Sequence, residues 1–284
     1  MWRKAVILLK LNKVFYISIF CILILICVSL FNYKKTEDKK ELFNAVENND
    51  IVSVKKIIEI YPEFINKERF NFFETVFLDA GSGTPFTIAV QKCDLEMIEL
   101  LVEYGADINK KVVDYPLNLA LNLGKYKIAW YLIENGARLD VISGNKTLPY
   151  VITYGHIKDE NISESKEDLA LLKYVIEQGI SINPIIDSGL PSLLGYAAGF
   201  NNVEIVKYLL DSGYFDIDDI VSDFGETALI LAVKSASKKH FGYKTCEFLI
   251  SSGANKEIKD NNGKTALDYA IEFEDEKLIE MLSE

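Results

Sequence analysis

The sequence contains little of the side-chain chemistry on which many enzymes and disulfide-rich proteins depend. It has 2 histidines and 4 cysteines in 284 residues. Two histidines leave few ways to build a metal site or a catalytic triad from imidazole groups. Four cysteines, with Cys21 and Cys27 inside an apolar run, are too few for a disulfide scaffold. We therefore expect no catalytic residue, no metal and no cofactor, and predict that the protein is not an enzyme.

Acidic residues are absent from the first 35 positions, which hold six Lys and Arg residues. Residues 36–284 contain the other 25 basic residues and all 42 acidic residues, a net charge of −17. An acidic body is poorly suited to bind nucleic acid, because it cannot neutralise phosphates. The same charge would steer a basic protein partner toward it. We expect a protein partner and neither nucleic acid nor a small-molecule substrate.

Residues 14–31 form a run of 18 residues without a charge. As a helix the run would be about 27 Å long, which matches a bilayer core. We predict a short basic segment at 1–13, a transmembrane helix at 14–31 and a linker at 32–40. A cleaved signal segment is the alternative, because a basic start and an apolar run are common to both.

Basic residues before the run predict the orientation of the chain. Lys and Arg dominate the N-terminal flank, while the other flank mixes basic and acidic residues. The positive-inside rule then places the N-terminus in the cytoplasm and the body on the periplasmic or extracellular side. If the segment is cleaved, the body is secreted instead.

The body, residues 41–284, is built from internal repeats. The segment GTPFTIAVQKCDLEMIELLVEYGADIN at 83–109 recurs as DYPLNLALNLGKYKIAWYLIENGARLD at 114–140. Further copies begin near residues 41, 146, 190, 225 and 262. Five copies have a glycine where the second helix would end: Gly105, Gly136, Gly179, Gly213 and Gly253. The pattern predicts a series of short helix pairs.

These segments resemble the ankyrin repeat, whose signature is T-P-L-H-x-A. Thr84-Pro85-Phe86-Thr87-Ile88-Ala89 and Thr227-Ala228-Leu229-Ile230-Leu231-Ala232 are two of the matching stretches. The resemblance covers about residues 40–284. It implies an all-α solenoid of about seven helix-turn-helix repeats that binds a protein partner through its concave face and loop tips. Short anchored proteins of this kind also suggest a bacterial source.

The resemblance assigns partner binding to variable positions of the repeats. On the concave face these are Gln91, Lys92, Asn122, Leu123, Tyr154, Phe200 and Lys234. Exposed aromatic rings would be strong contact residues, although they could equally pack beneath neighbouring loops.

Aliphatic pairs in successive loops add further candidates, namely Val112, Ile142, Ile186 and Ile220. The pairs could form an apolar contact stripe, or they could pack between adjacent loops. The second interpretation is favoured, because β-branched doublets suit short strands. The two interpretations can be tested: if the pairs form a contact stripe, Ile142→Ser with Ile186→Ser weakens partner capture and leaves the melting temperature nearly unchanged, whereas a large drop in melting temperature shows that they belong to the core.

Three functions remain open. The first is a membrane-tethered adaptor that binds a protein partner. The second is an immunity or inhibitor protein that neutralises a toxic enzyme, since a net charge of −17 suits a basic toxin. The third is an enzyme with its site in the insertions at 67–82 and 155–168, which the shortage of His and Cys makes the least favoured.

Overall fold

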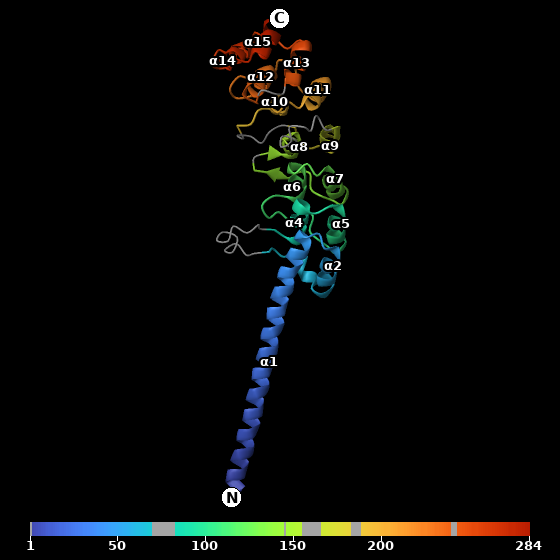
Figure 1. Ribbon diagram of the computed structural model, residues 1–284, viewed down its shortest axis with the longest axis vertical. Coiled ribbons are helices and arrows are strands. Elements are labelled where there is room, and N and C mark those ends of the chain that lie inside the picture. The colour runs from blue at the N-terminus through green and yellow to red at the C-terminus, as the bar shows by residue number, and fades with distance from the viewer. Residues whose placement is uncertain (1, 70–82, 145, 155–165, 183–188, 240–242) are drawn as a thin grey trace. The chain divides into compact units, whose positions relative to one another are not determined.

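The computed structural model describes residues 2–69, 83–144, 146–154, 166–182, 189–239 and 243–284. Of residues 2–19, 166 and 239 it describes the backbone and not the side chains. The chain divides into two compact units, Met1–Asp107 and Ile108–Glu284. Figure 1 labels the helices and strands of each unit. The described part of both units is mainly helical.

The first unit begins with one long helix, α1 (Trp2–Glu47). It continues through α2 (Ile51–Ile60), the short 3-10 helix η1 (Pro62–Phe64), α4 (Pro85–Lys92) and α5 (Leu95–Glu103). The end of α1 packs against α2 and α4, and α2 packs against α5. Leu42, Phe43 and Val46 are buried there. The last turns of α1 therefore serve as the first helix of the first repeat.

Residues 32–40, which the sequence analysis predicts to be a linker, are a continuous part of α1. Lys35 Nζ forms an ion pair with Glu63 Oε1 at 2.6 Å, and Lys39 Nζ donates to the Arg69 carbonyl at 3.4 Å. Lys and Glu favour helix, so a mixed charged stretch suits a solvated helix as well as a loop. The contacts with η1 and Arg69 explain why the helix is the form observed.

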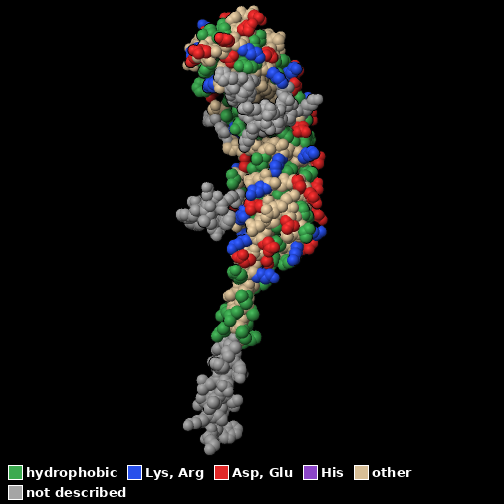
Figure 2. All heavy atoms as spheres, viewed as in Figure 1, with side chains coloured by type: hydrophobic (Ala, Val, Ile, Leu, Met, Phe, Trp, Pro, Cys, Tyr) green, Lys and Arg blue, Asp and Glu red, His purple; other side chains and the backbone are tan. Residues whose placement is uncertain are grey.

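The apolar side chains of α1 lie on the surface of the helix. Phe20, Leu25 and Leu30 are each more than half exposed. Figure 2 shows the apolar side chains gathered around this part of α1. The predicted span covers 14–31, and the side chains of its first six residues lie outside the described part. Among the described residues, no helix has both the length and the apolar character needed to cross a membrane.

The second unit consists of helix pairs in two rows. The first helices of the pairs are α6 (Pro116–Asn122), α8 (Leu148–Tyr154), α10 (Leu193–Gly199), α12 (Ala228–Lys239) and α14 (Ala266–Glu272). Their partners are α7 (Tyr126–Glu134), α9 (Lys166–Glu177), α11 (Val203–Asp211), α13 (Tyr243–Ser251) and α15 (Glu276–Ser283). Each first helix contacts the next one in its row. Neighbouring helix pairs thus bury each other's apolar sides, as repeat architectures require.

Glycine ends the second helices as predicted. Gly105, Gly136, Gly179, Gly213 and Gly253 all have φ between 68° and 89°, the left-handed conformation that suits glycine. The turns inside the helix pairs are left-handed at Asn49, Gly124 and Asn201, with φ of 55°, 67° and 57°. Glu274 adopts the same turn at φ 56°, whereas Cys93 is extended at φ −99°.

Two short strands, β1 (Ile142–Ser143) and β2 (Lys146–Thr147), precede α8 and modify the all-α prediction. They are antiparallel, with Ile142 opposite Thr147 and Ser143 opposite Lys146. A bridge between Ile220 and Thr227 repeats this pairing before α12. Successive residues of a strand point to opposite sides. Each aliphatic doublet here is therefore divided into one inner and one outer residue.

Candidate functional site

The loop-tip candidates illustrate this division. Val141 and Val221 are buried, while their neighbours Ile142 and Ile220 are 42% and 57% exposed. The packing interpretation therefore holds for Val141 in the first doublet and for Val221 in the second. The outer residues Ile142 and Ile220 remain available for contact. Val112 is half-buried, whereas Val113 is exposed. Ile186 lies outside the described residues.

In the first unit, Gln91 and Lys92 are exposed at the end of α4. Lys92 Nζ forms an ion pair with Glu47 Oε1 at 2.8 Å, and Arg69 Nη1 binds the same carboxylate oxygen at 2.8 Å. Hydrogen bonds from Arg69 and Lys92 lower the pKa of Glu47. Lys92 is therefore already engaged within the repeat.

In the second unit, Asn122 and Tyr154 line one hollow of about 290 Å³. Asn122 ends α6 and Tyr154 ends α8. The other lining residues are Ser143 of β1, Lys146 of β2 and Val151 of α8. Leu123, next to Asn122, is exposed. The structure thus brings together two candidates that are 32 positions apart, together with three residues that the sequence analysis did not name as candidates.

Aromatic rings form one wall beside Lys146. Its ammonium lies 4.4 Å from the centre of the Tyr154 ring and 5.8 Å from that of Tyr196. Phe200 makes edge contacts with Tyr154 at 5.5 Å and with Tyr196 at 4.6 Å between ring centres. Tyr154 and Phe200 pack against each other and are half-buried, so part of each ring stays accessible to solvent. The rings hold the ammonium by cation–π attraction.

Asp114 holds Ser143, one of the residues that line the hollow. Its carboxylate accepts hydrogen bonds from the Ser143 hydroxyl, from the Tyr115 backbone N–H at 2.8 Å and from Asn118 Nδ2 at 3.2 Å. The Ser143 hydroxyl donates to Asp114, so its oxygen can only accept further bonds. The hollow therefore presents a cation, an amide, a phenol and a fixed acceptor.

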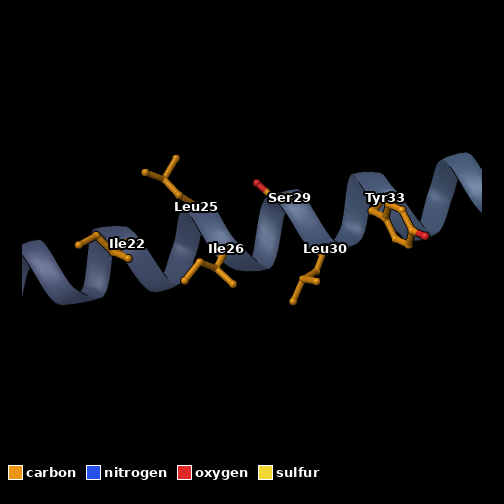
Figure 3. Close-up of a pocket in the computed structure, with 6 residues that line it drawn as sticks. All are labelled: Ile22, Leu25, Ile26, Ser29, Leu30 and Tyr33. Atoms are coloured by element: carbon orange, nitrogen blue, oxygen red, sulfur yellow. The ribbon is translucent and has the colours of Figure 1, made fainter.

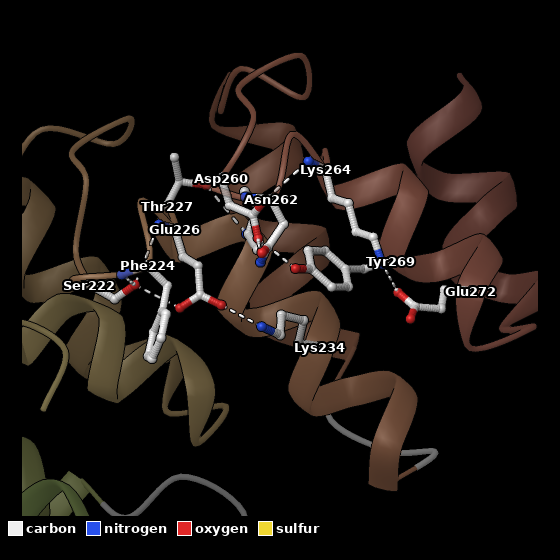
Figure 4. Close-up of polar contacts among 11 residues, drawn as sticks. Ser222, Phe224, Glu226, Thr227, Lys234, Asp260, Asn262, Lys264, Tyr269 and Glu272 are labelled. Carbon is white, nitrogen blue, oxygen red and sulfur yellow. Dashed lines mark hydrogen bonds and ion pairs between the residues drawn. The ribbon is translucent and has the colours of Figure 1, made fainter. Parts of the chain in front are cut away.

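Lys234 belongs to a different cluster, which Figure 4 shows between α12 and α14. Its ammonium lies 2.5 Å from the buried Glu226 Oε1 and 4.6 Å from the centre of the Tyr269 ring. Ser222 Oγ donates to the other Glu226 oxygen at 2.6 Å. Burial lowers the pKa of Lys234, but the Glu226 carboxylate outweighs it and the net shift is upward. This candidate is thus an internal ion-pair partner.

Asp260 anchors the same cluster. Its carboxylate accepts the Tyr269 hydroxyl at 2.5 Å and the backbone N–H groups of Asn262 at 2.9 Å and Lys264 at 3.0 Å. Burial raises its pKa, yet these hydrogen bonds together outweigh burial, so the pKa lies below its ordinary value. The carboxylate is therefore ionised at neutral pH.

A second buried carboxylate, Asp168, lies in the first turn of α9 and accepts the Tyr126 hydroxyl of α7. Burial raises the pKa of Asp168 to about 7. The hydrogen bond from Tyr126 lowers this pKa, and the charge of the nearby Glu167 raises it. The Asp168 side chain is fully buried. Because its pKa is near 7, the charge of Asp168 changes with pH at the contact between α7 and α9.

The sequence predicts no metal site, and the candidate metal ligands and buried thiols can be located in the described part of the chain. There, no group of three or more His, Cys, Asp or Glu side chains is placed to hold a metal ion. Most of the two insertions, 67–82 and 155–168, lies outside the described residues. Cys93 and Cys246 are both buried, and burial raises the pKa of the Cys246 thiol to about 12. Such a thiol is a weak nucleophile.

A sequence profile of the ankyrin repeat family, which spans three repeats, matches residues 42–143, 162–260 and 194–284. The chain belongs to the ankyrin repeat family. Ankyrin repeats imply a protein–protein interaction module. The helix pairs, glycine caps and strand-paired loops described above are the structural form of those repeats.

Two ankyrin repeat proteins are similar over most of the chain. One from Fowlpox virus is 26% identical over 205 residues, which are 70% of this chain and 30% of the relative. One from Rickettsia felis is 29% identical over 223 residues, 66% of this chain and 55% of the relative. Human diacylglycerol kinase iota is 38% identical over 92 residues, only 8% of that protein. The chain thus spans less than two thirds of each of these ankyrin relatives.

Lys146 could have been found from the repeats themselves. It directly precedes Thr147, just as Glu226 precedes Thr227 and Lys264 precedes Thr265 at the start of later repeats. In both later repeats this position carries an ion pair. The shared position of a charged residue before the threonine was the available signal.

Proposed function

We propose that the chain is a non-enzymatic adaptor, tethered to a membrane, that captures a protein partner on its second unit. The observation that carries the proposal is the hollow lined by Asn122, Lys146 and Tyr154, with the exposed Leu123 beside it. It combines a partly covered tyrosine ring with a cation and an amide in one hollow, and tyrosine is enriched at protein interfaces and among their strongest contact residues. Ile142 and Ile220, on the strand-paired loops, extend the contact surface.

Site-specific photo-crosslinking in the native host tests this binding surface. A benzophenone amino acid at Leu123, in the full chain, should crosslink one discrete partner. The matched control is the same amino acid at Lys127, an exposed residue on α7 of the same repeat. Asn122→Ala should lower the Leu123 crosslink at least fivefold without changing the melting temperature. Equal crosslinking from Leu123 and Lys127 would contradict the proposal.

Residues 14–31 are the proposed membrane tether, with the N-terminus in the cytoplasm and the repeats on the far side. Support comes from the uncharged run, the six basic residues without an acidic one in the first 35, and the exposed apolar side chains on α1. Figure 3 shows six side chains between Ile22 and Tyr33 that project from this one helix. A secreted body after signal cleavage is the alternative.

Carbonate extraction of cell membranes tests the tether. The full chain should stay in the membrane pellet, and Leu25→Arg with Ile26→Arg should move most of it to the supernatant. Val52→Arg, at an exposed position of α2, is the matched control, and this variant should stay in the membrane pellet. An intact mass that lacks the first 30 or so residues would establish cleavage instead.

An inhibitor of a basic toxic enzyme is the second candidate function. The net charge of −17 on residues 36–284 is the observation that favours it, because opposite charges accelerate association. The partner recovered by crosslinking separates the two candidates. A basic enzyme whose activity is lost on binding would support inhibition, and a partner without such activity would support the adaptor.

A further inference from the structure

We propose that the hollow between α6 and α8 binds the carboxylate of a glutamate or aspartate side chain on the partner, through Lys146. The inference rests on the proposed function, because it assumes that a protein partner covers this surface. It is also unexpected from net charge alone, since the body is strongly acidic. Equivalent positions in three repeats differ in a way that leaves Lys146 without an acidic partner side chain among the described residues.

Two positions near the first helix of a repeat can be compared between repeats. One directly precedes the threonine at the start of the helix, and the other is the seventh residue of that helix, eight positions later in the chain. In the last repeat they are Lys264 and Glu272, which form an ion pair at 2.7 Å. In the preceding repeat they are Glu226 and Lys234, paired at 2.5 Å. The geometry of the repeat therefore brings these two positions into ion-pair contact whichever carries the acid.

In the repeat that begins with α8, the same two positions are Lys146 and Tyr154. The lysine is kept, but a phenol replaces the acid. Lys146 Nζ instead lies over the Tyr154 ring at 4.4 Å. Among the described residues, no carboxylate forms an ion pair with this ammonium. A cation–π contact does not use up the three N–H donors of the ammonium as hydrogen bonds to a carboxylate would.

The position of the missing acid is open rather than filled. Lys146 and Tyr154 both line the hollow of about 290 Å³, which also has Asn122 on its wall. In the last repeat the corresponding acid, Glu272, is itself half exposed to solvent. An acidic side chain from outside could thus reach Lys146 as Glu272 reaches Lys264. The Asn122 amide, at the equivalent seventh position of α6, offers a second donor to the same carboxylate.

The remaining walls favour a carboxylate over a phosphate. A single ammonium balances one negative charge, and Asp114 already places a carboxylate behind Ser143. A doubly charged phosphate would meet repulsion from Asp114 with one lysine to offset it, and phosphate sites are usually built from several cations or helix N-terminal N–H groups. The hollow is therefore matched to a single acidic side chain.

Binding of small blocked amino acids to the full chain in non-ionic detergent tests the inference. N-acetyl-glutamate-N-methylamide is the probe, and N-acetyl-glutamine-N-methylamide is its uncharged match. Saturation-transfer NMR should detect the glutamate probe at millimolar concentration and give at least fivefold less signal for the glutamine probe. N-acetyl-alanine, which carries a main-chain carboxylate, should also bind more weakly. Equal binding of the glutamine probe would overturn the carboxylate, and stronger binding of N-acetyl-alanine would overturn the side-chain assignment.

Variants of the chain then locate the binding. Lys146→Met should lower the glutamate signal at least fivefold, while Lys111→Met, an exposed lysine 5.1 Å from the centre of the Tyr115 ring and outside the hollow, should not. Tyr154→Glu places an acid where the last repeat has Glu272. This glutamate should pair with Lys146 and lower the binding of the glutamate probe as much as Lys146→Met does. Tyr154→Gln, the uncharged control, should lower that binding less than twofold.

Unchanged binding in Lys146→Met or in Tyr154→Glu, with the circular dichroism spectrum retained, would overturn the inference. The Leu123 crosslink would be unaffected by that outcome, because it requires only that a partner covers the surface. Conversely, loss of the crosslink with probe binding intact would contradict the proposed function and leave the carboxylate site standing as a site for a free acidic ligand.

Discussion

Asp168 and Asp260 are both buried and both accept a hydrogen bond from a tyrosine hydroxyl, yet their pKa values shift in opposite directions. Asp168 lies in the second-row helices, where burial raises its pKa more than the hydrogen bond from the Tyr126 hydroxyl lowers it. Asp260 lies in a loop before α14 and also accepts two backbone N–H groups. At Asp260 the hydrogen bonds therefore outweigh burial and keep the carboxylate charged, whereas at Asp168 burial is the larger effect.

The largest expected effect is at Asp168. Its unfolded pKa is about 3.9, and its native pKa is raised to about 7, so the native state binds the proton more tightly. The stability from this group is present at low pH and is lost as the pH rises from about 4 through 7. With about 1.4 kcal/mol per pKa unit, the ionised Asp168 costs at most about 4 kcal/mol at pH 8.

We therefore expect Asp168→Asn to raise the free energy of unfolding at pH 8 by up to about 4 kcal/mol, with little change near pH 4. Urea unfolding of the full chain, followed by circular dichroism at pH 4, 6 and 8, measures the difference. Asp211→Asn, at an exposed position, is the control. Parallel pH curves for Asp168→Asn and the unmodified chain would break the comparison.

The matching change at Asp260 should have the opposite sign. Asp260→Asn removes a charged acceptor of the Tyr269 hydroxyl and two backbone N–H groups, and should lower the free energy of unfolding at pH 7 by about 2 to 3 kcal/mol. Because its native pKa is lowered, this stability is present above about pH 4 and is lost as the pH falls through the native pKa.

The same unfolding experiment should show Asp168→Asn matching the unmodified chain at pH 4, and, when it is extended below pH 4, Asp260→Asn approaching the unmodified chain as well. Asp223→Asn is the control for Asp260, because Asp223 is exposed and its backbone carbonyl accepts a hydrogen bond from Asn261, the residue after Asp260. A stabilising effect of Asp260→Asn at pH 7 would mean that its hydrogen bonds do not outweigh burial.

The smallest effect comes from the two tyrosines, which are equally buried at 6% exposure. At pH 6 Tyr269→Phe removes a bond to an ionised carboxylate and should cost about 1.5 to 2 kcal/mol. Tyr126→Phe removes a bond to a mostly protonated carboxyl group and should cost about 1 kcal/mol or less. Thermal unfolding of the two variants at pH 6 measures both. Equal losses would show that both carboxylates are in the same state.

The repeat architecture could be predicted from the sequence because its signals are local. Gly105 and Gly136 end their helices in the predicted left-handed turn. Thr84 caps α4, accepting the Thr87 N–H at its side chain. Each of these features depends on backbone preferences within a few residues, and such preferences can be read without knowledge of distant contacts.

The features that sequence reasoning did not predict depend on distant partners. The stretch 32–40 carries a charge pattern that fits a solvated linker, whereas in the observed helix Lys35 forms an ion pair with Glu63, 28 positions away. Lys234 was assigned to partner binding because its position varies in the family, but Glu226 and Tyr269 already hold it. Lys146 is not among the residues that the sequence predicts. Its importance depends on Tyr154, which occupies the position where the last repeat has the acidic partner Glu272.

Because α1 is one continuous helix, the direction in which its exposed apolar side chains point is set by the number of residues between them and the first repeat. The exposed apolar residues and the buried Leu42 and Phe43 belong to one helix without a hinge residue between them. One residue inserted between positions 34 and 35 would turn everything upstream by about 100° and lengthen the rod by about 1.5 Å. Rotation of the apolar end about its axis is thereby transmitted directly to the first repeat.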